Sequence, residues 1–448
     1  MDAFADLPGD VLVAILVRLP ARSIAGCSQV CRTWRSAISH PTFDVAHAER
    51  PAAVVKVTAV DEVYDFVLED VYRAFRPTPM TRTSVVIDLF RGRWHHDNLH
   101  INPKQPLTRA LILRASSVLL GSWDGVVCMK PRTTMTGWPS CPPRLHKQYV
   151  LWNPLTMAYA AVSLPPGDPD DGEVIGGYSH PSTRRFHLVH ASGKTTLGAL
   201  MALKTLRILR VGDDDAIWRE IPLGLQEEDN PTTARLSNIS IDTHHARCVR
   251  LHGNLHWLVQ WGSSESTTTL QLLTFDTTQE KFCLMEAPPR TRSQDADNLT
   301  NTRLGVLSGG KLCAFVVQSS TSSMDVWVLD GYQAMPPPRI SSCWRLKERI
   351  GLVLPDRSDW SLKFCVDTEV EVVEGVREGE EIFLRHGDRI DTYNLRCKEW
   401  RMVNVSRSAH TVMHRENILQ PEVSFGAASR ALSRSPTVDK NGHIRYGL

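Results

Sequence analysis

The sequence predicts a mainly β protein with a small helical unit at its N-terminus. From about residue 50 onward, the helical spacing of apolar residues gives way to short alternating runs separated by Gly, Pro, Asn and Asp. No long helical window lies between these runs, and several strand-and-turn elements recur along the chain. These observations together favour an antiparallel β-propeller, with two stacked β-sandwiches as the alternative.

The helical unit is expected to hold three short helices. Pro8 suits a helix start because its missing N–H would be unpaired there, and Pro20 ends the first helix by Leu19. The apolar face of this helix repeats at i, i+3, i+4 and i+7, in Leu12, Ile15, Leu16 and Leu19. A second helix is expected over about Ala21 to Cys27. The third helix carries one apolar stripe, with Arg32 and Arg35 facing away, and Pro41 closes the unit; the stripe is Val30, Cys31, Trp34, Ala37 and Ile38.

This unit has more apolar side-chain surface than three short helices can bury between themselves. Units of about forty residues are marginal alone and usually need a staple or a partner. The sequence supplies no disulfide or metal pattern here, so the surplus is expected to dock on another protein. Its members are Val11, Leu12, Ile15, Leu16, Leu19, Ile24, Val30 and Trp34. Trp34 is interpreted as a core anchor of the unit.

The same segment resembles an F-box in the order and spacing of its motifs. They read Leu7-Pro8-x-Asp10, Ile15-Leu16-x-Arg18-Leu19-Pro20, Ser23-Ile24 and Val30-Cys31-Arg32-x-Trp34-Arg35. The resemblance implies binding to the Skp-type adaptor of a cullin-RING ubiquitin ligase. The adaptor-binding residues are then expected to be Leu7, Pro8, Ile15, Leu16, Leu19, Pro20, Ile24 and Val30.

The amino-acid composition argues against several other classes of partner. The 448 residues carry 51 Lys and Arg against 49 Asp and Glu, a formal charge of +2, which removes any general electrostatic case for nucleic acid or an anionic membrane. The apolar run Val11 to Val17 is too short for a span that needs about twenty residues. The ten cysteines are scattered singly behind an acidic N-terminus, so reduced thiols in the cytoplasm or nucleus are expected.

Thirteen short runs are predicted as strands, and three kinds of element connect them. Strands are expected over residues 54–57, 84–89, 117–120, 125–129, 149–152, 185–189, 248–251, 255–259, 270–275, 312–317, 324–329, 382–384 and 390–395. The first element is an aromatic residue with Asn or Asp, a turn and a second aromatic residue, at Trp152-Asn153, Phe275-Asp276 and Tyr393-Asn394. There the Asn or Asp is expected to cap the turn, and the second aromatic residue to pack over the first strand.

The second element is a hairpin at Gly253-Asn254, Gly309-Gly310 or Gly387-Asp388, and the third is an outer-strand tryptophan, Trp218 or Trp344. The markers recur about every fifty to seventy residues. About six or seven four-stranded blades would fit the available length, and radial repetition would protect the sheet edges.

This region resembles the F-box-associated domain of plant F-box proteins. The resemblance rests on Trp152-Asn153-Pro154, Leu251 to Trp257, Phe275-Asp276 and Val326-Trp327-Val328. The expected organisation is an F-box over residues 1–45, a linker or irregular first blade over 46–114, a propeller-like domain over 115–413 and a flexible tail over 414–448.

No catalytic or metal site is predicted. Familiar nucleophile, phosphate-loop and zinc motifs are missing from the sequence. His252 and His256 are interpreted as turn and strand residues because Gly253-Asn254 makes a hairpin between them. Solvated loops or polar turns are also the interpretation for the remaining polar segments: Arg91 to His96 with His100, Asp168 to Gly172, and Asp213 to Asp215.

The expected function is that of a non-catalytic adaptor without a cofactor. Its helices would fasten the chain to the ligase, and its β-domain loops would hold a protein substrate near the ubiquitin-loaded enzyme. A stand-alone ligand-binding propeller with a structural helical cap is the alternative. A third possibility is a hydrolase or lectin that uses a propeller face, but no set of residues in the sequence supports it.

Overall fold

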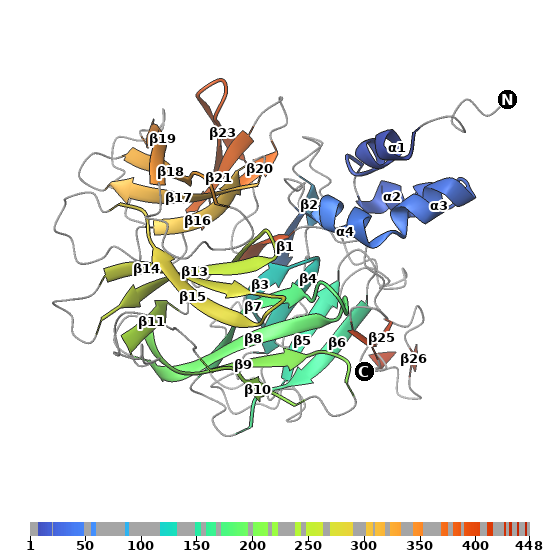
Figure 1. Cartoon of the computed structure of the whole chain (residues 1–448), viewed down its shortest axis with the longest axis horizontal. Coiled ribbons are helices and arrows are strands. Elements are labelled where there is room, and N and C mark those ends of the chain that lie inside the picture. The colour runs from blue at the N-terminus through green and yellow to red at the C-terminus, as the bar shows by residue number, and fades with distance from the viewer. Residues whose placement is uncertain are drawn as a thin grey trace, which may run out of the picture.

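The computed structural model of the chain is mainly β, with helices at the N-terminus (Figure 1). It describes residues 8–19, 21–48, 55–59, 86–88, 117–131, 148–153, 158–166, 172–195, 200–213, 217–222, 238–242, 248–262, 269–289, 302–307, 310–318, 323–332, 344–352, 369–374, 380–386, 389–403, 410–414, 425–426, 430–431, 437–438 and 444–445. None of the helices in these ranges is long and apolar enough to span a membrane.

The described N-terminal residues form four short helices. They are α1 (Gly9–Leu16), α2 (Ala21–Cys27), α3 (Arg32–Ile38) and α4 (Pro41–Ala48). The expected second helix is confirmed, but Pro41 begins a helix instead of closing the unit, because proline is well tolerated in a first helical turn. Phe43 on α4 is fully buried against Leu12, Leu16, Ile24 and Ile38. The fourth helix therefore completes the small core.

The strands follow one another in chain order from near the N-terminus to the C-terminus. They are β1 (Val55–Ala59), β2 (Val86–Asp88), β3 (Ser117–Trp123), β4 (Val126–Pro131), β5 (Gln148–Asn153), β6 (Ala158–Ser163), β7 (Gly172–Ser179), β8 (Phe186–Thr195), β9 (Leu200–Arg210), β10 (Arg219–Glu220), β11 (Ile239–Asp242), β12 (Val249–Leu251), β13 (Asn254–Trp261), β14 (Thr269–Asp276), β15 (Lys281–Glu286), β16 (Thr302–Leu307), β17 (Lys311–Gln318), β18 (Ser323–Leu329), β19 (Trp344–Gly351), β20 (Glu369–Glu374), β21 (Glu380–His386), β22 (Arg389–Asn394), β23 (Glu399–Val403), β24 (His410–His414), β25 (Arg430–Ala431), β26 (Thr437–Val438) and β27 (Ile444–Arg445). All thirteen predicted strands coincide with one of these.

Antiparallel pairing sorts most strands into five consecutive groups, β3–β6, β7–β10, β12–β15, β16–β19 and β20–β23. Strand β11 bridges β9 and β13, so that the second and third groups form one nine-stranded sheet. Four core clusters lie between successive groups; the one between β16–β19 and β20–β23 contains Phe315, Val326 and Ile382. Each group therefore packs its face against the next group along the chain.

Strands from the two ends of the β region meet in a further sheet. Strand β1 pairs with β2 on one edge and with β24 on the other, in the order β2-β1-β24. Five residue pairs join β1 to β24, from Val55 opposite His414 to Ala59 opposite His410. The segment between the helices and β3 thus carries two strands, one of which ties the start of the β region to its end.

Two of the three predicted turns contain the expected side-chain cap, and the turn after Trp152-Asn153 lies outside the described residues. Asp276 Oδ1 accepts the backbone N–H groups of Thr278 and Gln279 at 2.7 and 2.9 Å, and Asn394 caps its own turn in the same way. The second aromatic residue lies over the first, with ring centroids 4.6 Å apart for Phe275 and Phe282. The hairpin turn predicted at Gly253-Asn254 lies one residue earlier, at His252-Gly253, where both residues have positive φ, and Asn254 is already the first residue of β13. Gly387-Asp388 lies outside the described residues.

Three outer tryptophans link successive groups through their indole N–H. Trp218, next to β10, donates to the carbonyl of Ser163 at 2.9 Å; Trp344 on β19 donates to Glu286 and Trp400 on β23 to Gly351, both at 3.1 Å. Each acceptor is the last residue of the outer strand in the preceding group. We call these bonds the tryptophan links. Phe282 holds the corresponding place on β15, and there β11 joins the neighbouring groups instead.

The link at Trp344 is expected to contribute measurably to stability. Replacing Trp344 by Phe removes the N–H and leaves the Glu286 carbonyl without this donor, which should lower the free energy of unfolding by about 1 kcal/mol more than the smaller ring alone. The matched control is Trp327→Phe, because the Trp327 indole N–H is buried and has no hydrogen-bond partner among the described residues. Urea unfolding of both variants tests this; equal losses would contradict it.

Candidate functional site

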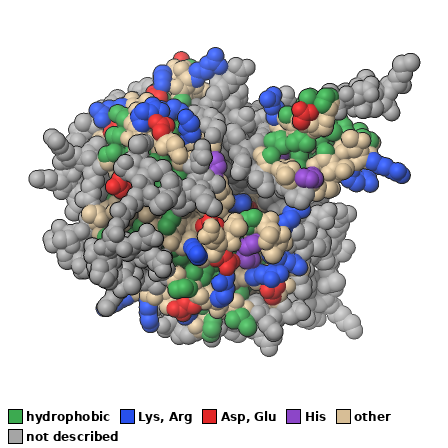
Figure 2. All heavy atoms as spheres, viewed as in Figure 1, with side chains coloured by type: hydrophobic (Ala, Val, Ile, Leu, Met, Phe, Trp, Pro, Cys, Tyr) green, Lys and Arg blue, Asp and Glu red, His purple; other side chains and the backbone are tan. Residues whose placement is uncertain are grey.

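The first candidate site is the face of the helical unit. Leu12 and Leu16 of α1 point into the unit's own core and are 3% and 0% exposed. Val11 and Ile15, one position earlier in each turn, are 40% and 45% exposed, and Val30 after α2 is 64% exposed. Figure 2 shows hydrophobic side chains gathered on the visible face of this unit. The expected surplus of apolar surface is therefore present.

The residues expected to bind the adaptor divide by burial. Pro8, Ile15 and Val30 are exposed and Leu19 is half-buried, whereas Leu16 and Ile24 are buried in the helical core. Leu7 and Pro20 lie outside the described residues. Trp34 packs partly buried on the same core, as expected, and Arg32 and Arg35 are exposed. Val11 belongs to the exposed set because it lies four residues before Ile15 on the same helix face.

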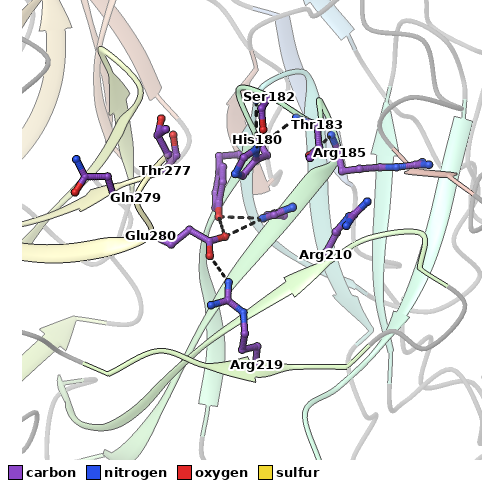
Figure 3. A network of polar contacts seen from close by, with 12 residues as sticks. His180, Ser182, Thr183, Arg185, Arg210, Arg219, Thr277, Gln279 and Glu280 are labelled. Atoms are coloured by element: carbon purple, nitrogen blue, oxygen red, sulfur yellow. Dashed lines mark hydrogen bonds and ion pairs between the residues drawn. The ribbon is translucent and has the colours of Figure 1, made fainter.

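The second candidate site is a polar network between two groups of strands (Figure 3). The Tyr178 hydroxyl on β7 donates to Glu280 Oε1 at 3.2 Å, and Arg219 on β10 forms an ion pair with Oε2 of the same carboxylate. Figure 3 shows the Glu280 and Arg219 side chains pointing toward each other. Glu280 belongs to the turn between β14 and β15. The network therefore joins that turn to the β7–β10 group.

His187 on β8 is the titratable member of this network. Its Nδ1 lies 3.0 Å from the Tyr178 oxygen, and because the Tyr178 proton points to Glu280, Nδ1 carries the proton that His187 donates. Burial, with His180 nearby, lowers the pKa of His187 to about 4. Its Nε2 is buried without a hydrogen-bond partner among the described residues. His187 is thus neutral at pH 7.

The chemistry of this network is that of a structural connection. Tyr178 is fully buried, and burial beside Glu280 raises the pKa of its hydroxyl, so it has little nucleophilic character. The same repeat position is used again with reversed charge: Lys398, with positive φ like Glu280, places Nζ 2.5 Å from Glu348 Oε2 on β19. The β14–β15 turn and the β22–β23 turn, in the third and fifth groups, therefore each reach the preceding group through an ion pair.

A third polar cluster surrounds His256. Its Nδ1 donates to the Val249 carbonyl at 3.0 Å, so Nε2 accepts the Tyr332 hydroxyl at 2.7 Å, and Asn254 donates to the same Tyr332 oxygen at 3.1 Å. His252 Nε2 lies 3.0 Å from the carbonyl of Gly310. The two histidines thus occupy strand and turn positions with separate partners, as the sequence predicts.

No metal-binding site is apparent within the described ranges. No group of three or more His, Cys, Asp or Glu side chains there could hold a metal ion. Asp213 forms an ion pair with Arg210, at 3.4 Å between Oδ1 and Nε. The segments Arg91 to His96 with His100, Asp168 to Asp171, and Asp214 with Asp215 lie outside the described residues.

Comparison with solved structures finds proteins of low similarity. A Hadza microbial sialidase, Hz136, is 9% identical with a TM-score of 0.37, over 68% of this chain and 61% of the sialidase. A luciferin-regenerating enzyme is 10% identical with a TM-score of 0.32, over 66% of this chain and 79% of that enzyme. This chain therefore spans less than two thirds of the sialidase.

Sequence comparison is more informative. Residues 4–43 match the F-box-like family, and residues 226–336 match the F-box associated beta propeller domain. The F-box protein At3g07870 of Arabidopsis thaliana is 23% identical over 441 residues, which are 91% of this chain and 90% of that protein. These matches confirm the resemblance to plant F-box proteins: an F-box-like segment opens this chain, and an F-box associated β-propeller sequence follows it.

Proposed function

We propose that this protein is the substrate-recognition subunit of a Skp-cullin-F-box ubiquitin ligase. The helical unit binds a Skp-type adaptor, and the β region holds a protein substrate within reach of the ubiquitin-loaded enzyme. The gain is in effective concentration, so the chain forms no bond itself and needs no cofactor. The site of action is the cytoplasm or the nucleus.

The main support for this proposal is that a family match and an exposed apolar face fall on the same residues. The F-box-like match over residues 4–43 covers the part of the chain where Val11, Ile15 and Val30 are exposed. These three account for most of the large hydrophobic side chains that are exposed among the described residues, the others being Ile217 and Leu346. An apolar face left over after a small core is complete suits a partner helix or groove. Leu16 and Ile24 support that face from below.

The finer architecture is proposed with it. The five groups of strands would be five blades, and β1, β2 and β24 would contribute to a sixth, which closes a ring through the pairing of β1 with β24. The proposed units are 1–48, 49–114, 115–414 and 415–448, moved from the expected 1–45, 46–114, 115–413 and 414–448 so that α4 (Pro41–Ala48) and β24 (His410–His414) each stay whole. Substrate would bind loops on one face of the ring.

A pull-down with the purified adaptor tests the proposal. Ile15→Glu places a charge in the centre of the exposed face without touching the core, so adaptor binding is expected to fall at least a hundredfold while circular dichroism stays unchanged. The matched control is Ile217→Glu, which changes an isoleucine in the β region that is even more exposed, at 74%, and should leave binding intact. Retained binding by the Ile15 variant would refute the proposal.

A further inference from the structure

The strongest unassigned feature is the place where the chain near its C-terminus returns to the β region. Phe425 is fully buried in the core between β3–β6 and β7–β9, far in sequence from the other members of that core. Its ring stands edge-on to that of Phe186, with centroids 6.4 Å apart and an interplanar angle of 85°. The segment predicted as a flexible tail therefore fills an aromatic pocket.

The backbone at Phe425 crosses the backbone just after the end of β9 at close range. Gly212, with φ +90°, lies so near that a Cβ there would overlap the carbonyl oxygen of Phe425. On the other side, a Cβ on Gly426, with φ +51°, would lie only 2.9 Å from the backbone carbonyl oxygen of Gly212. Two glycines thus leave room for one main chain to lie across another.

Five residues later the segment becomes a strand. Arg430 and Ala431, which form β25, pair antiparallel with Tyr159 and Ala158 of β6. Strand β6 is the outer strand of the β3–β6 sheet, so without β25 its backbone groups at this position would face outward unpaired. An aromatic anchor followed by strand addition is a recurring way in which domains bind extended peptides.

We propose that this place is a peptide-binding site, occupied here by the chain's own Phe425 and Gly426 and by Arg430 and Ala431. Its ligands are extended peptides with an aromatic side chain for the Phe186 pocket, a glycine after it and a short strand for the edge of β6. The described attachment consists of one buried ring and a two-residue strand, and such small units open at a lower free energy than the whole fold. A peptide from another protein competes with the tethered segment and must overcome its high effective concentration.

The test uses the full chain and a fluorescent peptide of its residues 421–434. Phe425→Ala empties the pocket, so this variant is expected to bind the peptide at least tenfold more tightly than the wild-type chain in fluorescence anisotropy. A peptide with Ala in place of the phenylalanine should bind neither. Equal binding by variant and wild type, or equal binding of the two peptides, would overturn the proposal. The adaptor pull-down is independent of this result.

Two glycine variants in the Phe425→Ala background sharpen the test. Gly212→Ala should abolish peptide binding because its methyl group occupies the path of the peptide backbone. Gly331→Ala is the matched control: its φ is also positive, at +75°, but nothing lies within 4 Å of the added Cβ. If Gly331→Ala weakens binding as much as Gly212→Ala does, the backbone crossing is not the binding site.

A second arrangement covers the case in which Phe425→Ala fails to fold. A protease site is inserted between residues 415 and 424 of the full chain and is cut after folding. Excess labelled peptide should then replace the cleaved segment. A cleaved segment that stays bound, with no labelled peptide entering after prolonged incubation, would overturn the proposal.

Discussion

Trp257→Ala is expected to lower the free energy of unfolding by about 4 kcal/mol, a large fraction of the about 5–15 kcal/mol that holds a typical protein folded. Trp257 on β13 is fully buried in the core between β7–β10 and β12–β15. Its indole N–H donates to the Ile175 carbonyl at 2.8 Å across that core. Truncation therefore removes a large ring and orphans a buried carbonyl at once.

Space around this ring is provided by a glycine on the neighbouring group. A Cβ on Gly176 would lie 2.9 Å from Trp257 Cζ2, so β7 has a glycine where the indole rests on it. The control is Trp261→Ala on the same strand, because Trp261 is only partly buried. Chemical unfolding should give it less than half the loss of Trp257→Ala. Similar losses would contradict this account of the core.

Acid should destabilise the protein steeply between about pH 6.5 and pH 4. Burial lowers the pKa of His187 and His256 to about 4 and that of His190 to about 3, whereas the unfolded chain titrates near 6.5. Below pH 6.5 the unfolded state binds more protons, so stability falls as the pH falls, by about 1.4 kcal/mol per pH unit for each histidine, until the folded pKa is reached. Above pH 6.5 these groups contribute no pH dependence.

One buried carboxyl works in the opposite direction. Burial raises the pKa of Glu173 above its usual value, so the folded state binds that proton before the unfolded state does and gains stability as the pH falls. Because three histidines act against this one carboxyl, the free energy of unfolding is expected to decrease as the pH falls. Urea unfolding at several pH values measures it.

His256→Gln separates the contribution of one histidine. A glutamine can donate to Val249 and accept from Tyr332 without titrating, so the slope of stability against pH should fall by about one third. An unchanged slope would show that His256 does not take up a proton on unfolding.

Local chemistry is what made much of the fold predictable. The turns at Asp276 and Asn394 depend on side chains within three residues, and these caps and their packed aromatic pairs formed as predicted. Strand β9 was not predicted although it is the longest, because its register shifts opposite Ser192 and Gly193. Its buried positions change phase there, from 201 and 203 to 206 and 208, and no single alternation runs through it.

Other strands were missed because tertiary contacts decide them. Strand β7 contains Gly176 and Gly177, which weaken a strand by themselves but leave room for the rings of Trp257 and Phe186. Strand β19 is a partial exception, because an outer strand was predicted at its first residue, Trp344, while the rest of it carries mostly exposed charged residues and has no alternating pattern. The return of Phe425 has no local signal at all, since its pocket comes from residues more than two hundred positions earlier.

The candidate site on the helices was predictable in kind but not residue by residue. The sequence indicates too much apolar surface, and this is confirmed by Val11, Ile15 and Val30. Helical periodicity places Ile15 and Leu16 on one broad face, whereas the core formed with Ile38 of α3 and Phe43 of α4 covers only the part of that face that holds Leu16. Which half of the face is covered depends on that fourth helix.

The pairing of β1 with β24 has a consequence for protein synthesis. Residues 55–59 leave the ribosome well before their partner strand at 410–414, which is translated about 350 residues later. Throughout elongation β1 therefore keeps one edge open to neighbouring polypeptides. A nascent chain that stalls before residue 410 cannot complete this sheet, so translational pausing late in the message should leave an aggregation-prone product.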